Sequence, residues 1–209
     1  CGHAWADLEL SPERLAALYG PGYFDGEEYR DYPGDRAVLQ KSFRRRLAEL
    51  EPFLDPARHR RLLEVGCAYG FFLDLARGRF EAVSGIDVSA EAVRHARDSL
   101  SLDAVQGDVL AHGFGSRSFD VVCLWDTIEH LPRPDLAVAR IHEQTEPGAL
   151  LALTTGDIGS LLARLRGRRW RLIHPPTHLH YFTRGSLRRL LERSGFEVID
   201  DRTCGVHRS

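Results

Sequence analysis

Short apolar runs alternate with amphipathic stretches between residues 61 and 155. The runs have the length and composition of buried strands, whereas in the stretches between them apolar residues recur at helical spacing. Such an alternation predicts a parallel sheet with helices on both faces. The expected strands lie at 62–65, 82–86, 104–105, 119–125 and 149–154, and the expected helices near 70–78, 89–100 and 134–145.

The first run ends in a turn rich in small residues. Gly66, Ala68 and Gly70 separate the strand from the next helical pattern. Glycine permits a tight turn and the close approach of a ligand to the backbone, and the N–H groups at a helix start face that ligand. The second run ends in Asp87, about 20 residues later, where an acid binds ribose in dinucleotide folds. We therefore expect a nucleotide-type ligand at the carboxyl ends of the strands.

The ordered motifs resemble those of the class I S-adenosylmethionine-dependent methyltransferases, in particular the small-molecule branch with the ubiquinone-biosynthesis O-methyltransferases. The resemblance covers about residues 60 to 200. It implies a doubly wound, mostly parallel Rossmann-like α/β sheet with an N-terminal helical cap. The matching stretches are Glu64-Val-Gly-Cys-Ala-Tyr-Gly, Gly85-Ile-Asp-Val-Ser, Gly107-Asp-Val, Phe119-Asp-Val-Val, Ile128-Glu-His-Leu, Glu146-Pro-Gly-Ala-Leu-Leu and Ser194-Gly-Phe-Glu-Val.

The resemblance also implies where S-adenosyl-L-methionine binds. Asp87 would accept hydrogen bonds from the ribose hydroxyls, Asp108 from the adenine amino group, and Asp126 would face the amino end of the cofactor. The alternative is that Asp87 and Asp108 are only turn residues at strand ends. The full expected set is Glu64, Gly66, Cys67, Ala68, Gly70, Asp87, Val88, Gly107, Asp108, Val109, Trp125 and Asp126.

Three histidines are candidates for a catalytic base: His130, His178 and His180. Methyl transfer gains most from orientation and exclusion of water, and a base helps when the acceptor is a hydroxyl. A supporting or capping role is the alternative for His130. Asp126-x-x-Glu129-His130 is similar to a metal-ligand set of some quinone O-methyltransferases, but the first acid there is usually Glu. We therefore expect no metal.

The segments that flank the alternating region are less regular. Ser11 begins an expected helix, and 38–54 predicts a second one with Arg44, Arg45 and Arg46 on its solvated side. The alternative is that an arginine of the 41–46 cluster meets the cofactor carboxylate. Tyr23, Phe24 and Tyr29 either anchor the cap on the core or line the active site. We expect residues 1–56 to form the N-terminal segment and cap, and 57–209 the cofactor-binding domain with an insert at 156–183.

The insert and the C-terminal part carry further expectations. A short helix is expected at 161–165, and the arginine cluster at 164–171, around Trp170, either binds an anionic acceptor or is a solvated loop. A helix near 184–194 and a strand at 196–200 follow. The family normally adds a last antiparallel strand, for which the chain leaves little room, so the sheet is one strand short or the C-terminus is truncated.

Composition narrows the class of partner. With 28 basic and 30 acidic side chains the net charge is −2, which gives no overall drive toward nucleic acid or a membrane. No apolar stretch is long enough to span a bilayer and no signal peptide is evident. Scattered cysteines indicate a reducing compartment. We expect a cytoplasmic monomer or homodimer that acts on a small molecule.

The N-terminus raises one further hypothesis. Cys1-Gly2-His3 followed by Trp5 is either the end of a zinc-ribbon knuckle or an unremarkable terminus, and we expect no zinc here.

The leading functional hypothesis is methyl transfer to a small molecule, at a hydroxyl oxygen. The first alternative is a non-catalytic cofactor-binding module that serves a partner. The second, a nicotinamide-dependent oxidoreductase, is disfavoured because Lys41 is the only lysine and no Tyr-x-x-x-Lys dyad exists.

Overall fold

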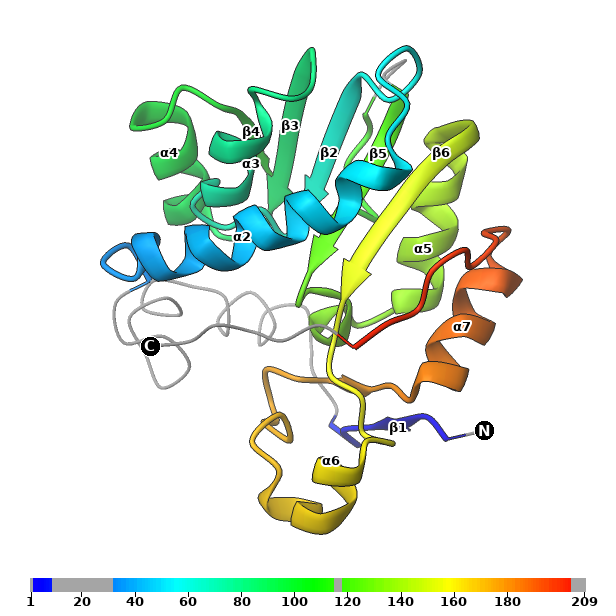
Figure 1. Ribbon diagram of the computed structural model, residues 1–209. Helices are drawn as coiled ribbons and strands as arrows, with labels where there is room; N and C mark the ends of the chain where they lie inside the picture. Colours follow the sequence, from blue (N-terminus) through cyan, green and yellow to red (C-terminus); the bar gives the residue numbers. More distant parts are fainter. Residues whose placement is uncertain (1, 9–31, 115–117, 204–209) are drawn as a thin grey trace.

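Five parallel strands form the sheet that the alternating pattern predicts (Figure 1). The structure is a computed structural model and describes residues 2–8, 32–114 and 118–203. The strand order is β4-β3-β2-β5-β6, so the direction of winding reverses between β2 and β5, where ligands bind in such sheets. The strands are β2 (Arg61–Val65), β3 (Ala82–Asp87), β4 (Asp103–Gln106), β5 (Phe119–Trp125) and β6 (Thr145–Thr154).

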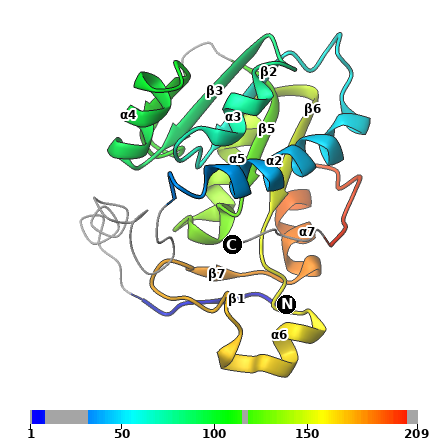
Figure 2. The ribbon, with the colours of Figure 1, turned by 60° about the vertical axis from the view of Figure 1, so that its left-hand side comes forward.

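Helices cover both faces of this sheet and enclose one apolar core on each side (Figure 2). Successive strand residues point to opposite faces, so Leu62 and Val121 join one core while Leu63 and Val122 join the other. The first face carries α2 (Arg36–Leu50), α3 (Phe71–Ala76) and α4 (Ala90–Asp98), and the second carries α5 (Pro134–Glu143) and α7 (Arg184–Arg193).

The three helices expected between the strands are confirmed as α3, α4 and α5. Ser89 caps α4 by accepting a hydrogen bond from the backbone N–H of Ala92 at 3.3 Å. The last expected strand, 149–154, is observed as β6, which begins earlier, at Thr145, and therefore includes Gly148. This glycine has a φ of +89° and lies where the register of β6 against β5 shifts.

The helix expected at 38–54 forms as α2, followed by a 3-10 turn, η2 (Glu51–Phe53). Arg44 and Arg45 are exposed as expected, but the prediction for Arg46 is wrong because its side chain is buried. Arg46 shares the inner face of α2 with Phe43 and Leu47. Its charge is tolerated there because the guanidinium pairs with the carboxylate of Asp126, directly after β5.

The strand expected at 196–200 is wrong: no described residue after α7 belongs to a strand. The segment has no pairing neighbour among the described residues, and other contacts hold it on α7. Phe196 donates its N–H to Leu191 O at 3.1 Å, and Arg184 and Arg188 of α7 both pair with Asp201. Among the described residues the main sheet therefore has five strands, all parallel.

A second, two-stranded sheet joins the N-terminus to the insert. Within it β1 (Ala4–Trp5) pairs antiparallel with β7 (His180–Tyr181). The insert also contains the expected short helix, α6 (Leu161–Arg166), and a 3-10 turn, η4 (Gly167–Arg169), which project away from the main sheet (Figure 1).

Some expectations fall outside the described residues, namely Cys1, the helix at Ser11 and the aromatic residues Tyr23, Phe24 and Tyr29. Within the described ranges, no helix is long and apolar enough to cross a membrane.

Candidate active site

The turn between β2 and α3 has the backbone geometry that its small residues predict. Gly66 and Gly70 have φ values of +75° and +78°, and a Cβ on Gly66 would lie 2.6 Å from the side chain of Thr127. Cys67 is buried within the turn. Ala68 also has a positive φ, and its N–H donates to Asp87 Oδ2 at 2.8 Å. The turn is therefore held against the end of β3.

Asp87 lies at the carboxyl end of β3, beside this turn. Its Oδ1 accepts a hydrogen bond from the N–H of Ser89 at 2.9 Å. Burial raises the pKa of Asp87, and the backbone N–H donors oppose that rise. The next residue, Val88, is 45% exposed, an apolar surface that a flat ring can cover. A carboxylate beside an exposed apolar residue suits a ribose with its attached base.

Glu64 adds a buried acceptor to the same strand end. Its side chain is buried, and Oε2 has no hydrogen-bond partner among the residues that the structure describes. Burial and the charge of Asp87 raise the pKa of Glu64 well above its usual value, while Arg46 lowers it. An orphaned buried carboxyl of this kind fits a ligand that brings its own donor, such as an ammonium or a hydroxyl.

The residues after β4 form a tight turn. Gly107 donates its N–H to Asp87 O at 2.9 Å, and Val109 is buried. Asp108 is exposed, and its Oδ1 accepts from the N–H of Leu110 at 2.8 Å, which is the bond that a turn residue makes. Both expected roles of Asp108, turn residue and adenine acceptor, are compatible with this geometry.

Trp125 and Asp126 close the row at the end of β5. Arg46 Nη2 lies 2.5 Å from Asp126 Oδ2, and its guanidinium lies 5.3 Å from the centre of the Trp125 ring. Thr154 Oγ1 donates to Asp126 Oδ1 at 3.0 Å. Arg46 is the site residue for which sequence reasoning preferred the wrong environment, a solvated helix face. Its spacing of three from Phe43 and four from Leu50 was the available signal, because it places Arg46 on the apolar face of α2.

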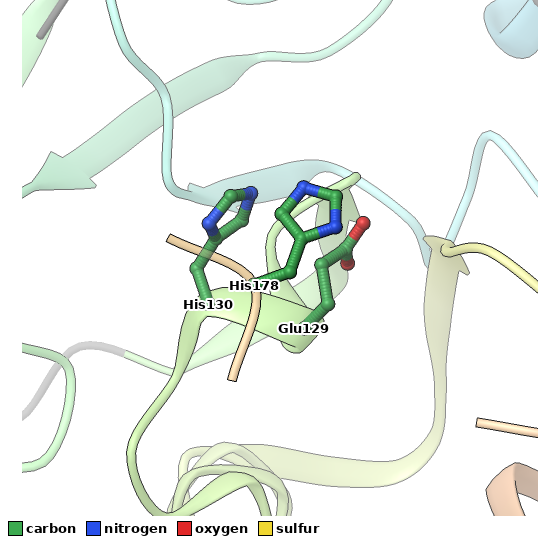
Figure 3. Close-up of side chains that lie close together, drawn as sticks. All are labelled: Glu129, His130 and His178. Carbon is green, nitrogen blue, oxygen red and sulfur yellow. The ribbon is translucent and has the colours of Figure 1, made fainter. Parts of the chain in front are cut away.

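Glu129, His130 and His178 come together in a second cluster (Figure 3). The first two belong to a 3-10 turn, η3 (Ile128–His130), and His178 comes from the insert. One ligand atom from each lies within 4.8 Å of the others. The structure thus brings together two of the three predicted histidines, although 47 residues separate them in the chain.

Backbone carbonyls fix the tautomers of both rings. His130 Nδ1 lies 2.9 Å from Thr177 O, and His178 Nδ1 lies 2.8 Å from Leu172 O. Since a carbonyl only accepts, each Nδ1 carries the proton and, in the neutral ring, each Nε2 carries the lone pair. These lone pairs suit a base or a metal ligand.

Glu129 is buried beside these rings. Burial and the charge of Asp126 raise the pKa of Glu129 to about 7, although His178 acts in the opposite direction. Its Oε2 has no hydrogen-bond partner in the described part of the chain. A carboxyl with this pKa can exchange a proton near neutral pH.

The possible ligand set in the structure differs from the motif Asp126-x-x-Glu129-His130 in the sequence. Asp126 is engaged by Arg46 and Thr154, so His178, and not Asp126, completes a possible ligand set with Glu129 and His130. Two imidazoles and a carboxylate form a donor set that suits divalent transition metals.

His180 lies apart from the other two candidates. Its Nδ1 is 3.1 Å from His3 Nε2, and its Nε2 is 3.4 Å from Pro132 O. This places it in the β1–β7 sheet and outside the lining of the cavity described next.

A cavity of about 1000 Å³ begins at this cluster. Its walls include Trp125 and Asp126 at the cofactor side, the length of β6, and the inner side of α7. From the insert it takes Leu162, Trp170 and Arg171. The glycine turn does not line it. The cavity therefore runs along the edge strand β6 and reaches the strand ends that carry the expected cofactor residues.

Comparison with known proteins identifies the family. A family model described as a methyltransferase domain matches residues 36–201. The chain belongs to this family. The family and the fold imply S-adenosyl-L-methionine as the cofactor, which the buried acceptor Glu64, the half-buried Asp87 and the glycine turn fit. This assignment decides against the nicotinamide alternative.

Individual relatives show both the likeness and its extent. The chain is 29% identical to the malonyl-[acyl-carrier protein] O-methyltransferase of Erwinia pyrifoliae, covering 75% of this chain and 58% of the relative. It is 27% identical to the ubiquinone biosynthesis O-methyltransferase of Thiobacillus denitrificans, covering 68% and 67%. Among solved structures, the [4+2]-cyclase SpnF matches with a TM-score of 0.60 and 28% identity over 76% of this chain and 59% of that one.

Proposed function

We propose that this protein transfers the methyl group of S-adenosylmethionine to a hydroxyl oxygen of a small molecule bound in the cavity beside Glu129, His130 and His178. The observation that supports the proposal is that this titratable cluster lines a large cavity, which also reaches Trp125 and Asp126 among the expected cofactor residues. The O-methyltransferase names of both curated relatives favour oxygen as the acceptor atom.

The bound cofactor supplies an electrophilic methyl group on a positively charged sulfur. The protein's own part is to orient the acceptor, exclude water and remove a proton. Glu64 would hold the amino end together with Asp126, and Asp87 would hold the ribose. Arg46 neutralises Asp126 and lies near Glu64, which makes it suitable for the carboxylate of the cofactor.

His130 is the proposed base. Its Nδ1 proton is fixed on Thr177 O, so Nε2 can accept the proton of an acceptor hydroxyl. The resulting imidazolium lies beside Glu129, whose ionised form stabilises the positive charge. His178 holds the other side of the cluster, with the two imidazole centres 4.7 Å apart. Arg171 lines the same cavity, and we propose that it favours acceptors that carry a negative charge.

Radiolabelled methyl transfer from S-adenosylmethionine to a panel of phenols, catechols and hydroxy acids tests this proposal. We expect His130→Gln to lower kcat by about 100-fold or more, since a positioned base contributes at least that much. His180→Gln is the matched control because its ring lies outside the cavity, and it should retain most of the activity. Equal losses in both variants would contradict the assignment of His130.

The same assay distinguishes a base from a metal ligand. With a chelator present, activity that depends only on His130 as base persists. Activity that is lost on chelation, is restored by one divalent ion and disappears in Glu129→Gln and His178→Gln would assign the cluster to a metal.

A second candidate is a reaction that uses the same cavity without methyl transfer. The 28% identity to the [4+2]-cyclase SpnF favours it, because a cyclisation transfers no methyl group. Cofactor binding without label transfer to any acceptor would favour this candidate or a non-catalytic binding module.

A further inference from the structure

Helix α6 presents an apolar face that no described residue covers. Leu161, Leu162 and Leu165 are 73%, 54% and 78% exposed, whereas Ala163 is buried against the protein. Figure 1 shows α6 at a tip of the molecule, beyond the small β1–β7 sheet. Exposing three large apolar side chains to water costs free energy, and no contact with a described residue offsets that cost.

Helical geometry groups these leucines and puts arginines on both sides of them. At about 100° per residue, Leu161 and Leu165 lie about 40° apart and Leu162 lies about 60° beyond Leu165. Arg164 precedes this arc and Arg166 follows it, while Ala163 is on the opposite, inward side. The outward face is thus a leucine strip with a cation at each edge.

The surrounding chain is strongly basic although the whole molecule is not. Between Asp157 and Glu192 the sequence holds eight arginines and no carboxylate, in a chain of net charge −2. Arg184 and Arg188 pair with Asp201 on α7. By contrast, Arg164, Arg166, Arg168 and Arg169 are exposed, and no described carboxylate pairs with them.

We propose that α6 and η4 form a docking surface for an anionic lipid bilayer. A convex tip with outward leucines and flanking arginines matches an interface in which apolar side chains enter the acyl boundary and guanidinium groups meet phosphates. An acidic protein partner would need a groove complementary to this convex tip. It would leave part of the leucine strip exposed to water. The expectation of no membrane partner rested on whole-chain charge, which hides this local surface.

The position of the cavity is consistent with this surface. Leu162 and the adjacent Arg171 line the cavity that begins at Glu129 and His130. Docking of α6 would therefore bring one wall of the cavity to the lipid surface. The proposal concerns the surface alone and does not depend on the reaction.

Vesicle flotation tests the proposal with the whole chain. Vesicles of phosphatidylcholine alone are compared with vesicles containing phosphatidylglycerol, at low and high salt. We expect binding to the anionic vesicles and release by salt. The joint change Leu161→Ser, Leu162→Ser, Leu165→Ser should lower the partition coefficient by about 100-fold, and so should glutamine at Arg164, Arg166, Arg168 and Arg169 together.

Matched controls keep the test specific. Leu136→Ser with Ile199→Ser changes exposed apolar residues elsewhere, and glutamine at Arg44, Arg94, Arg97 and Arg193 removes the same charge from other surfaces. Both controls should bind like the wild type. The proposal is overturned if the wild type does not float with anionic vesicles, if the patch variants bind as well as the controls, or if the patch instead mediates self-association or binding to a polyacidic protein only.

Discussion

Arg46 and Asp126 tie helix α2 to the carboxyl end of the sheet. The pair is close, with 2.5 Å between Nη2 and Oδ2, and the arginine side chain is 9% exposed. Two aromatic rings, Phe43 and Trp125, lie within 5.5 Å of the guanidinium carbon. The stability of a buried charge in such surroundings depends on its partner. Removing either side chain of the ion pair leaves the other desolvated and unpaired.

We therefore expect Arg46→Gln to lower the free energy of unfolding by about 2 to 4 kcal/mol in urea titrations. The neighbouring Arg45→Gln is the control. It removes an exposed pair with Glu49 on the same helix and should change stability by less than about 0.5 kcal/mol. Similar values for the two variants would contradict the structural role of Arg46.

The strands and helices from β2 to α5 were predictable because their signals are local. Leu62 and Leu63, or Val121 and Val122, serve opposite cores, and Ser89 marks a helix start within a few residues. Gly66 is likewise a local signal, because its backbone conformation and its close neighbour leave no room for a Cβ. The elements and the cofactor end of the sheet could therefore be predicted from sequence.

Elements that depend on distant pairing could not be predicted. The two-residue strands β1 and β7 have no pattern of their own and exist because segments about 175 residues apart pair. His178 reaches Glu129 through another long-range contact, in which Leu179 donates its N–H to Glu129 O at 2.8 Å. The strand expected at 196–200 failed for the converse reason, since no described strand pairs with this segment.

The β1–β7 pairing should weaken in acid. Burial lowers the pKa of both His3 and His180, which lie 3.1 Å apart, so the unfolded segment binds protons more readily than the paired one. Stability from this contact is present above the ordinary histidine pKa and is lost as the pH falls below it. We expect the Ala6 amide, which donates to Leu179 O, to lose hydrogen-exchange protection between pH 7.5 and 5.5.

A His3→Phe variant provides the comparison for that experiment. The ring still packs on Phe182, but the titrating pair is gone, so protection should change less with pH. Equal loss of protection in both proteins would show that the histidine pair is not responsible.

For the whole molecule, Glu129 should make stability fall as the pH rises. The pKa of its carboxyl is raised to about 7, so the folded state holds a proton that the unfolded state releases near pH 4.5. Between these values ionisation of Glu129 costs stability, on the order of 1 to 3 kcal/mol. Glu129→Gln should therefore gain stability relative to the wild type as the pH rises from 5 to 7, as measured by urea titration at each pH.

If the free energy of unfolding of Glu129→Gln differs from that of the wild type by the same amount at both pH values, the buried carboxyl does not hold a proton as described. Glu91→Gln, the same substitution at an exposed acid on α4, is the control.

Calorimetric titration can decide whether the carboxyl ends of β2 and β3 bind S-adenosylmethionine. S-adenosylmethionine, S-adenosylhomocysteine and NAD are titrated in parallel into the wild type, Asp87→Ala and the exposed control Asp98→Ala. We predict saturable binding of the two adenosyl ligands only, retained in Asp98→Ala and lost in Asp87→Ala. Absence of adenosyl binding to the wild type, preference for NAD, or full binding to Asp87→Ala would contradict the site.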